Sequence, residues 1–434
     1  MKGKKKVLVI TYYWPPVGGG GVQRWLKTSK YLPENGWEPI IFTPGNGESF
    51  VSDDKALSPI HKEMQVVKLP IWEPLSLYKK LTGKNKGQSV MVGLPSGEKG
   101  LLAKLSVWVR GNLFIPDAKM FWIRPASKFL IRYLKDNPVD AIVSTGPPHT
   151  THLIAKKVSK HHKIPWLADF RDPWTNIDFY HKLKLSKRAD KRHKKLENQV
   201  LHNAQHVVTV SKSWANDFLK NNGVAPELIT NGYDPEDFSK VGKLAIDKSF
   251  SITHAGSLND DRNSLIFWEV LRELKEELDG FEKDVQVNII GVIDHTALQD
   301  IKNNGLKNEV HILGTMSHEK AIEAMIRSTI LFLPLNDVPN IDGVIPGKLY
   351  EYIGAKRPIL CIGKKTGDCA KIIVETKSGV VVDFKEKALL KSTLVAYYKS
   401  YKENTLDVHS EAYQQYSRKL LSAKIAAALD RITS

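Results

Sequence analysis

Residues Asp342–Pro358 read DGVIPGKLYEYIGAKRP and follow the apolar run Thr329–Leu333, which is typical of a buried strand. Pro346 and Gly347 predict the start of a short helix, because the fixed φ of proline suits the first helical position. A helix start offers free N–H groups and the positive end of the helix dipole, and Lys348 adds a full charge there. Strand, polar loop and helix in this order predict an α/β fold with a phosphate site.

Glu351 lies one turn after Lys348, so both side chains project from the same face of the expected helix. A carboxylate in that place can accept hydrogen bonds from the paired hydroxyls of a sugar. The combination predicts a site for a nucleoside diphosphate. The alternative is that Lys348 and Glu351 form a solvated ion pair on an ordinary helix, and the motif alone leaves both interpretations open.

Length and composition indicate a globular protein of two domains, because 434 residues exceed what one core holds. We find no run of about 18 apolar residues, and the basic start leads straight into a strand, so we expect neither a membrane-spanning helix nor a signal peptide. Two cysteines without a Cys-x-x-Cys or His/Cys cluster predict a reducing cytoplasm and no structural metal.

Charge is unevenly distributed along the chain. Residues 1–200 hold 35 Lys and Arg against 16 Asp and Glu, a net charge of +19, whereas residues 201–434 hold 29 against 31, a net charge of −2. The densest basic stretch is His181–Lys195. Such a half suits nucleic acid, an anionic membrane surface or a polyanionic substrate, and the alternative is a basic face that only keeps the protein in solution.

The chain opens as a doubly wound sheet does. The apolar run Val7–Tyr13 predicts a central strand, Gly18–Gly21 a close backbone approach to a ligand, and Val22–Leu32 a helix. The glycines do not have the G-x-G-x-x-G spacing, so the indication of a dinucleotide-binding site is weak. Further strands are expected at Trp37–Thr43, Asp140–Ser144, Ile164–Phe170 and Gln205–Val210.

Residues 70–122 interrupt this alternation. Aromatic and aliphatic residues are interleaved there with Lys and Arg, which suits a helix lying on lipid or an acceptor-binding insertion. A helix packed on its own domain is the alternative.

Polar residues follow the strands that resume after this stretch. His149 comes after the strand at 140–144, and Arg171 and Asp172 come after the strand at 164–170. The carboxyl ends of parallel strands meet at one edge of the sheet, where open α/β sheets hold their ligands. These three residues are therefore the candidate reactive groups.

A second series of strands begins after a turn-rich stretch, which we interpret as a linker at residues 229–240. We expect an N-terminal domain at 1–228 with an insertion at 70–122, a C-terminal domain at 241–405 and a helical segment at 406–434. The chain from Leu389 to Ile432 is expected to be helical throughout. The strands expected in the second series are Phe250–Ala255, Val285–Gly291, Val310–Gly314, Thr329–Leu333, Pro358–Ile362 and Gly379–Val382.

Together these motifs resemble the family 4 glycosyltransferases, over nearly the whole chain. That family has the GT-B fold: two Rossmann-like, doubly wound α/β domains that face a central cleft, followed by C-terminal helices. The resemblance rests on the order and spacing of Pro15–Gly19, Asn231–Asp234 with Phe238, Ala255–Leu258 with Arg262, His311–Gly314 and Pro346–Pro358.

The resemblance implies a nucleotide-diphospho-sugar held mainly by the C-terminal domain. The diphosphate-binding lysine of the family falls at Arg262, and its usual arginine is replaced by Ser257, a loss for which Lys348 can compensate. Glu351 matches the glutamate that binds the ribose, while the residue that normally meets the donor sugar falls at Gly343, beside Asp342. The implied donor-binding set is Gly20, Gly21, Gly256, Ser257, Arg262, Gly314, Gly343, Val344, Gly347, Lys348 and Glu351.

The resemblance also implies a reaction. The charge that grows on the leaving nucleoside diphosphate would be stabilised by Arg262, Lys348 and the amides of the glycine turns, without a metal and without a cofactor other than the sugar donor. Retention of anomeric configuration is expected. Arg171 and Asp172 stand where the family often has a His-Asp pair, and Asp172, His149 and Arg171 form the implied catalytic set.

The implied partners are the nucleotide-sugar and a glycan or lipid-linked glycan of bacterial surface polysaccharide synthesis. An anionic membrane surface is a further expected partner and nucleic acid is not, so we expect a hexosyltransferase-type enzyme in the cytoplasm, peripherally at the inner face of the membrane.

Other functions are possible on the same residues. A GT-B-type nucleotide-sugar epimerase would share the fold and the diphosphate site, and a nucleic-acid- or membrane-binding protein without catalysis would use the basic half alone. An NAD-dependent oxidoreductase is disfavoured, because G-x-G-x-x-G is missing and no acidic residue ends the strand at 37–43.

Overall fold

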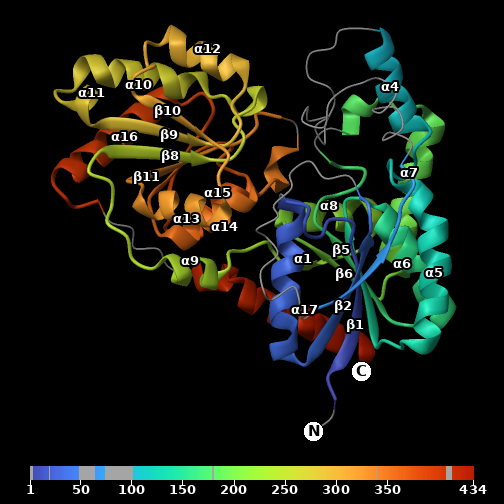
Figure 1. Ribbon diagram of the computed structural model, residues 1–434. Coiled ribbons are helices and arrows are strands. Elements are labelled where there is room, and N and C mark those ends of the chain that lie inside the picture. Colours follow the sequence, from blue (N-terminus) through green and yellow to red (C-terminus); the bar gives the residue numbers. More distant parts are fainter. Residues whose placement is uncertain are drawn as a thin grey trace. The chain divides into compact units, whose positions relative to one another are not determined.

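The computed structural model describes residues 3–18, 20–47, 64–73, 101–177, 180–338, 340–406 and 413–434. It has two compact units, Met1–Thr230 with Leu421–Ser434, and Asn231–Leu420 (Figure 1). Each unit is built on one parallel sheet. The boundary at Thr230 falls in the stretch expected to be a linker, but half of that stretch lies in helix α9 (Pro235–Val241) of the second unit.

The first sheet has seven parallel strands in the order β3-β2-β1-β4-β5-β6-β7. The five strands expected from apolar runs are present. The short edge strands β3 and β7 were not expected, because neither carries a continuous apolar run. The bounds are β1 Lys5–Ile10, β2 Trp37–Pro44, β3 Gln65–Leu69, β4 Ala141–Gly146, β5 Trp166–Phe170, β6 His206–Thr209 and β7 Glu227–Leu228.

Helices cover both faces of this sheet. On β2, Ile41 packs into a cluster with helices α1 and α17, whereas its neighbour Phe42 points the other way and stacks on Trp122 and on Phe129 of α5. Alternate side chains of a strand face opposite sides of the sheet, so both faces of this sheet are buried. The helices of this unit are α1 Gly20–Tyr31, α4 Leu101–Asn112, α5 Ile123–Asp136, α6 Thr150–His162, α7 Lys187–Asn203, α8 Lys212–Asn222 and the later part of α17 (Arg418–Thr433).

A buried carboxylate ties the first helix to the centre of this sheet. Asp169 on β5 is fully buried and accepts hydrogen bonds from the Arg24 guanidinium at 2.9–3.2 Å, from Trp25 Nε1 at 2.6 Å and from Thr145 Oγ1 at 2.8 Å. Burial alone would raise the pKa of Asp169, but Arg24 and these hydrogen bonds lower it below its usual range. The pair therefore stabilises the fold above the ordinary carboxyl pKa, and this contribution is lost as the pH falls through the lowered pKa.

The second sheet has six parallel strands in the order β10-β9-β8-β11-β12-β13. All six were expected. The bounds are β8 Phe250–Ala255, β9 Val285–Ile290, β10 Val310–Gly314, β11 Ile330–Pro334, β12 Ile359–Ile362 and β13 Gly379–Val382. The helices of this unit, besides α9, are α10 Leu265–Glu277, α11 Phe281–Asp284, α12 His295–Asn303, α13 His318–Arg327, α14 Gly347–Ala355, α15 Asp368–Glu375, α16 Lys387–Lys402 and the start of α17.

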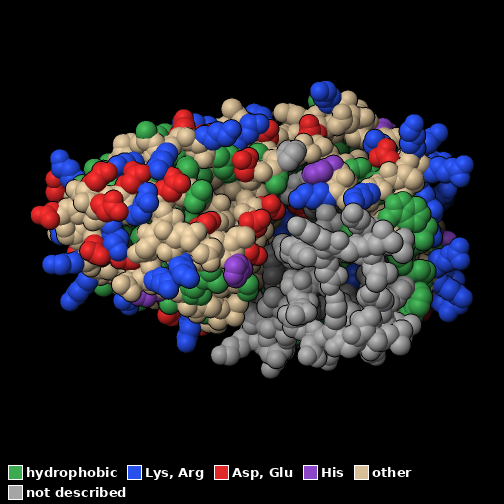
Figure 2. Space-filling model, turned by 90° about the horizontal axis from the view of Figure 1, so that it is seen from above, with side chains coloured by type: hydrophobic (Ala, Val, Ile, Leu, Met, Phe, Trp, Pro, Cys, Tyr) green, Lys and Arg blue, Asp and Glu red, His purple; other side chains and the backbone are tan. Residues whose placement is uncertain are grey.

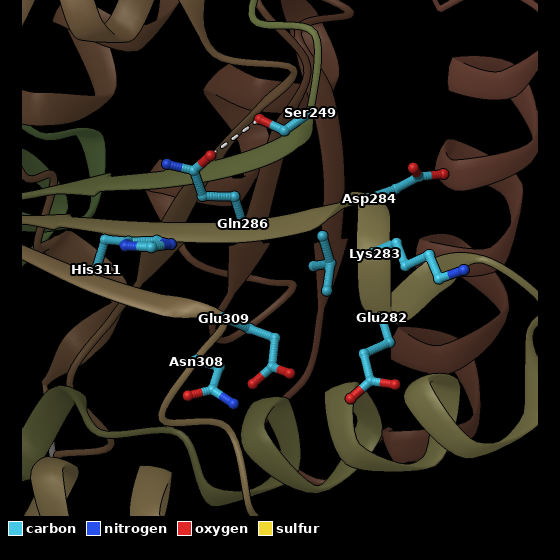
Figure 3. A pocket seen from close by; sticks show the side chains of 9 residues that line it. Ser249, Glu282, Lys283, Asp284, Gln286, Asn308, Glu309 and His311 are labelled. Atoms are coloured by element: carbon cyan, nitrogen blue, oxygen red, sulfur yellow. Dashed lines mark hydrogen bonds between the residues drawn. The ribbon is translucent and has the colours of Figure 1, made fainter.

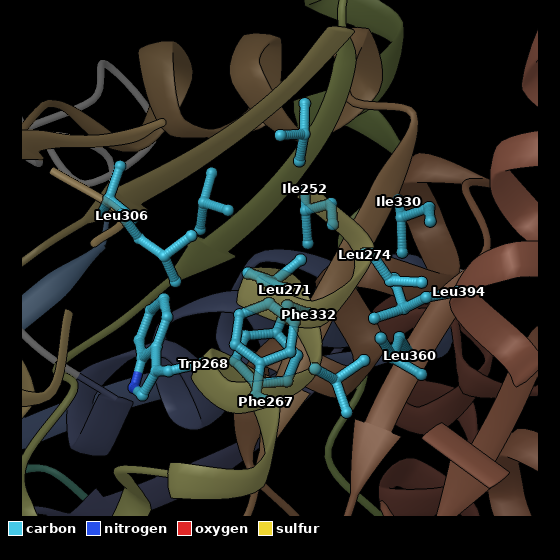
Figure 4. Close-up of a cluster of buried hydrophobic side chains, with 14 of the residues drawn as sticks. Ile252, Phe267, Trp268, Leu271, Leu274, Leu306, Ile330, Phe332, Leu360 and Leu394 are labelled. Atoms are coloured by element: carbon cyan, nitrogen blue, oxygen red, sulfur yellow. The ribbon is translucent and has the colours of Figure 1, made fainter. Parts of the chain in front are cut away.

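Two apolar clusters cover the two faces of the second sheet. Ile330 and Phe332 of β11 pack with α10, where the Phe332 ring stacks on Phe267 at 4.0 Å (Figure 4). Leu331 and Leu333 of the same strand point the other way and pack with α13 and α14. Both sheets are thus doubly wound, as the sequence predicted.

The C-terminal part differs from expectation. The chain is not helical throughout residues 389–432: α16 ends at Lys402, Asn404 adopts a positive φ of 53°, and α17 begins only at Arg418. Asn is one of the few residues that takes this left-handed conformation readily, and it ends helices for that reason. Nor is 406–434 a segment apart, because Leu421–Ser434 completes the core of the first unit.

The described residues contain no helix long and apolar enough to cross a membrane. Of the predicted insertion at 70–122, residues 74–100 lie outside the described part. The rest includes helix α4 and a short 3₁₀ helix at Met120–Trp122.

Replacing Asp169 by Asn should strongly destabilise the first unit. The substitution keeps the shape but leaves the buried Arg24 charge unpaired, so we expect the free energy of unfolding to fall by about 3–5 kcal/mol, measured by urea denaturation. The control is Asp430→Asn, which breaks an exposed ion pair with Lys5 and should cost less than about 1 kcal/mol. Equal losses in both variants would contradict the structural role of Asp169.

Candidate functional site

The carboxyl edge of the second sheet contains a point at which the strand order reverses. The order β10-β9-β8-β11-β12-β13 is the 3-2-1-4-5-6 order of a Rossmann fold, and the reversal lies between β8 and β11. Open α/β sheets bind ligands outside the strand ends at such a switch point. β8 ends at Ala255 and is followed directly by the candidates Gly256 and Ser257.

Arg262 spans the two loops of this switch point. It ends a short 3₁₀ helix after β8, its Nε donates to Asn336 Oδ1 at 2.8 Å, and its Nη1 donates to the Ser257 carbonyl at 3.3 Å. Asn336 follows β11, the strand on the other side of the reversal. The guanidinium is half-buried, so it is held in place and remains accessible to an anion.

Gly256 allows the backbone to pass close beside the next strand. Its φ is +152°, its N–H donates to the Ile290 carbonyl at 2.7 Å, and a Cβ on Gly291 would lie only 2.4 Å from the Gly256 oxygen. A side chain on Gly291 would push the strand ends apart, and the positive φ of Gly256 favours glycine there.

Lys348 and Glu351 form an ion pair at the start of α14. Lys348 Nζ lies 2.9 Å from Glu351 Oε2, and their side chains are 35% and 19% exposed. The helix begins at Gly347, with Pro346 just before it rather than at its first position. The structure therefore contains the ion pair of the alternative interpretation, but in a partly buried place at a helix start, where an anion is also favoured.

Tyr352 fixes α14 to the switch point. Its hydroxyl accepts from the Ala255 N–H at 2.8 Å and donates to the Phe332 carbonyl at 3.3 Å, so it joins the helix to both β8 and β11. In the sequence, Tyr352 is only one residue of the motif at 342–358. A tyrosine inside an apolar helix face gives no signal of where its hydroxyl binds.

His254 lies beneath this edge, where the positive charges of Arg262 and Lys348 both lower its pKa. The ring is buried on β8, with Nδ1 3.1 Å from the Phe332 carbonyl. Burial, with repulsion from Arg262 and Lys348, lowers the pKa of His254 to about 4. Arg262 and Lys348 therefore act on one neutral imidazole and belong to one electropositive neighbourhood.

His318 stands on the other side of Glu351, at the start of α13. Its Nε2 lies 3.1 Å from Asp237 Oδ2. Burial alone would lower the pKa of His318, but the bond to Asp237 and the nearby Glu351 charge raise it above its usual value. Sequence reasoning did not identify this histidine, whose raised pKa favours a positive charge beside Glu351.

The remaining candidates of the second unit lie on loops around this place. Gly314 ends β10 with a positive φ of 66°. Gly343 ends a short 3₁₀ helix, and Val344 follows it. Asp342 beside them pairs with Lys364 Nζ at 2.7 Å, so a carboxylate and a cation stand next to the glycine where a sugar ligand was expected.

In the first unit, Arg171 holds two loops together. Its buried guanidinium donates to the Gly21 carbonyl at 2.6 Å and to the Pro147 carbonyl. Gly20 and Gly21 are the first two residues of α1. With main-chain carbonyls engaged by both terminal nitrogens, Arg171 is built to position the glycine turn rather than to react.

His149 and His152 form a neutral pair after β4. Ser144 Oγ accepts from Trp166 Nε1 at 2.8 Å and also lies 2.7 Å from His152 Nδ1. Burial lowers the pKa of His152 to about 3 and that of His149 well below its usual value, so neither imidazole is charged at neutral pH.

The buried ring nitrogens of this pair converge beside Gly146. His152 Nε2 and His149 Nδ1 lie 2.6 and 3.0 Å from the place of a Cβ on Gly146, so the pair requires glycine at this position. Both nitrogens are without a hydrogen-bond partner within the part of the chain that the structure describes.

Asp172 is half-buried beside Arg171 and acts on its charge. The first unit thus brings together Gly21, Arg171, His149 and Asp172, whereas the second unit brings together Gly256, Ser257, Arg262, Lys348 and Glu351. The first group lies after β1, β4 and β5, and the second after β8 and β11, the strands expected to carry them.

A pocket of about 360 Å³ lies elsewhere in the second unit. It is lined by residues at the amino ends of the strands, among them Ser249, Gln286, Glu309 and His311 (Figure 3). Glu309 is held by Lys275 at 2.5 Å. The pocket faces away from the carboxyl edge and takes no part in the site. Across the described ranges, we find no group of three or more His, Cys, Asp or Glu placed to hold a metal ion.

Comparison with known proteins identifies a family. The family model described as Glycosyltransferase Family 4 matches residues 18–237, about half of the 434 residues. Comparison with curated protein sequences finds no match.

The whole chain is similar in structure to solved proteins. A glycosyltransferase from Rickettsia africae has a TM-score of 0.64 at 16% identity, over 99% of this chain and 98% of that one. Anabaena HepE in complex with UDP and glucose has a TM-score of 0.62 at 14% identity, over 98% and 99%. A putative UDP-N-acetylglucosamine 2-epimerase from Listeria monocytogenes has 0.57 at 11%, over 99% and 96%. At such identities the likeness shows the fold alone, and it confirms the expected GT-B class.

The charge state of the histidine pair can be measured directly. In long-range proton–nitrogen correlation spectra of histidine-labelled protein at neutral pH, we expect both rings to be neutral, because burial lowers both pKa values. Ser144→Ala removes the hydrogen-bond partner of His152 Nδ1 and should change the His152 signals, whereas Ser392→Ala, an exposed serine of α16, should change neither. A charged His149 or His152 ring at neutral pH would contradict the assignment.

Proposed function

The chain belongs to glycosyltransferase family 4 and is a transferase enzyme, and we propose that it moves a sugar from a nucleotide-diphospho-sugar to an acceptor hydroxyl. The donor diphosphate would bind at the switch point of the second sheet. The observation that carries this proposal is that Arg262 joins the loops after β8 and β11, while Tyr352 fixes the helix whose first turn holds Lys348 to the same two strands. Two cations at one switch point suit a diphosphate.

Three groups would neutralise the diphosphate. Arg262 is held by Asn336 and the Ser257 carbonyl with a half-exposed guanidinium, and it would take one phosphate. Lys348 would take the other, because an ammonium has three donors and can bond Glu351 and a phosphate at once. The free N–H groups at the start of α14 add the dipole of a nine-residue helix.

This arrangement supports departure of a nucleoside diphosphate without a metal. The negative charge on the leaving group grows in the transition state, so cations and amides fixed in advance lower the barrier more than they tighten ground-state binding. Glu351 would bind the ribose hydroxyls. Its ion pair with Lys348 orients it.

The residues of the first unit divide the remaining roles. His149, whose pKa is well below its usual value, would contact a substrate hydroxyl through a hydrogen bond and not act as a base. Arg171 would be a positioning residue for the glycine turn. Asp172 is then the carboxylate of the expected set that can accept a proton, and the donor phosphate is the other candidate base. Retention of configuration at the anomeric carbon is part of the proposal.

For the acceptor we propose a glycan or lipid-linked glycan of bacterial surface polysaccharide synthesis, and for the place the inner face of the cell membrane. The excess of +19 in residues 1–200 supports an anionic surface near the acceptor.

A thermal-shift screen tests the donor site. Over UDP-, GDP- and ADP-sugars, we expect one nucleotide to raise the melting temperature, with UDP first because Anabaena HepE was solved with it. Lys348→Ala and Glu351→Ala should each remove a charge-assisted contact of about 1.5–3 kcal/mol, which weakens binding roughly 10- to 100-fold.

The controls are Lys399→Ala and Glu403→Ala, which break an exposed i,i+4 ion pair on α16 of the same unit and should leave the nucleotide shift unchanged. Undiminished stabilisation in both Lys348→Ala and Glu351→Ala would refute the site.

An epimerase is the second candidate, since one similar structure is a putative UDP-N-acetylglucosamine 2-epimerase. An epimerase needs no acceptor, so the two functions separate when the enzyme is incubated with the best-stabilising sugar donor alone. We expect the donor to come back unchanged in chromatography against standards of its epimers. Formation of an epimer under these conditions would establish the second candidate instead.

A further inference from the structure

Large hydrophobic side chains are exposed in two stretches of the first unit, which the contact of Trp72 with Phe121 brings together. Trp72 is 60% exposed, Leu113 58%, Trp108 42% and Phe121 38%. Single exposed hydrophobic residues are common on soluble proteins. Four of the largest within residues 72–121, three of them aromatic, are unusual and indicate contact with something less polar than water.

The aromatic residues are held rigidly. Trp72 lies edge to face with Phe121 at 4.8 Å, and Phe121 lies edge to face with Phe114 at 6.0 Å. On either side of Trp72 the chain is anchored, since Ile71 is buried and buried Glu73 bonds Lys119 Nζ at 2.8 Å. Trp72 is thereby directed outward from a fixed base.

Helix α4, which carries Trp108, is joined to the start of the basic helix α7. A Cβ on Gly111 would lie 2.7 Å from Leu185, Asn112 Oδ1 accepts from the Ser186 N–H at 2.7 Å, and His193 Nε2 lies 3.2 Å from the Gly111 carbonyl. The end of α4 and the beginning of α7 therefore form one rigid corner.

The outer side of this corner is densely cationic. Along α7 the buried positions Ala189, His193 and Glu197 recur every four residues, which leaves the basic residues outside. Asp190 is engaged by Lys194 at 2.9 Å. The exposed cations are Lys182, Lys184, Lys187, Arg188, Lys191, Arg192, Lys194 and Lys195. Figure 2 shows hydrophobic side chains between groups of Lys and Arg at the right-hand edge of the molecule.

We infer that this aromatic–basic surface, made of Trp72, Trp108, Leu113, Phe121 and the exposed cations of residues 182–195, docks on an anionic lipid bilayer. Aromatic and aliphatic side chains enter the interfacial layer, and flanking Lys and Arg bind the headgroups. The inference names the surface that would hold the protein at the membrane and does not depend on the donor site.

The arrangement favours lipid over nucleic acid. Bases stack on flat, open ring faces, whereas Trp72, Phe121 and Phe114 pack edge to face against one another. Leu113, 58% exposed, has no ring on which a base could stack, but its apolar side chain can enter a bilayer.

The surface is also connected to the candidate site. Trp174 stacks on His149 at 4.7 Å, and its Nε1 donates to His193 Nδ1 at 3.0 Å. His193 in turn contacts the Gly111 carbonyl at the end of α4. Docking at this surface would therefore bring the His149 region of the first unit near the lipid, where a lipid-linked acceptor is found.

Vesicle flotation of the full chain tests the inference. We expect binding to vesicles of phosphatidylcholine mixed with phosphatidylglycerol and little binding to phosphatidylcholine alone. Each cation near an anionic surface contributes roughly fivefold, so Lys191→Glu with Lys195→Glu should weaken binding at least about 25-fold. The charge-matched control is Lys302→Glu with Lys307→Glu, two exposed lysines of the second unit, which should stay within about twofold of wild type.

The apolar part is tested by Trp72→Ser with Leu113→Ser, which should weaken vesicle binding even at high salt, where charge is screened. Val374→Ser, at an exposed valine of the second unit, is its control. No preference for anionic vesicles, equal losses in the control variants, or tighter binding to duplex DNA than to the vesicles would each overturn the inference.

Nucleotide-induced thermal shifts of the same variants separate this inference from the proposed function. A variant that loses vesicle binding but keeps the nucleotide shift supports the surface. Failure of every nucleotide to stabilise the wild type, with vesicle binding intact, would refute the donor site alone.

Discussion

The fold of the first unit depends on the negative charge of the Asp169 carboxylate, which is buried away from water. A buried carboxylate is tolerated only when its charge and lone pairs are matched, and Asp169 meets this requirement with Arg24, Trp25 and Thr145. These partners come from α1 and β4, so the requirement fixes the first helix against the central strands. Arg24 also donates to the Thr230 carbonyl at 2.8 Å, the last residue before the chain enters the second unit. The position of the glycine turn follows from the same arrangement.

Both sheets use the same order of strands, but they present different chemistry at the reversal. The second unit gathers cations over a neutral His254, and it anchors the helix that carries Lys348 through Tyr352. The first unit gathers imidazoles that burial keeps neutral, with Arg171 turned toward carbonyls. An anion is therefore favoured at one edge and a hydroxyl-bearing group at the other. This division matches a reaction in which a diphosphate leaves and a hydroxyl attacks.

Much of the architecture was predictable because buried parallel strands are continuous apolar runs. All six strands of the second sheet and five of the first were found this way. The candidate residues were predicted because they follow the carboxyl ends of these strands, which the topology of a parallel sheet brings together. The edge strands β3 and β7 escaped because they lack apolar runs, and the break after Lys402 escaped because Asn404 gives only a weak signal.

Side-chain partners were less predictable than strands. Nothing in the sequence shows that Arg171 donates hydrogen bonds to the carbonyls of Gly21 and Pro147, or that the Tyr352 hydroxyl bonds to two strands. These contacts depend on residues far apart in the chain, whose approach only the folded structure reveals. His149 illustrates the difference: its position was predicted, but its neutral state follows from burial and from the neighbouring His152.

The return of α17 to the first unit constrains the order of biosynthesis. Leu421, Ile425, Ala428 and Leu429 complete the apolar cluster that holds Val7 and Trp25. The unit that is translated first therefore lacks part of its core until residues 421–434 leave the ribosome. A nascent chain would hold the face of its opening sheet partly uncovered for most of its synthesis, and a polypeptide cut anywhere before residue 421 would never cover it.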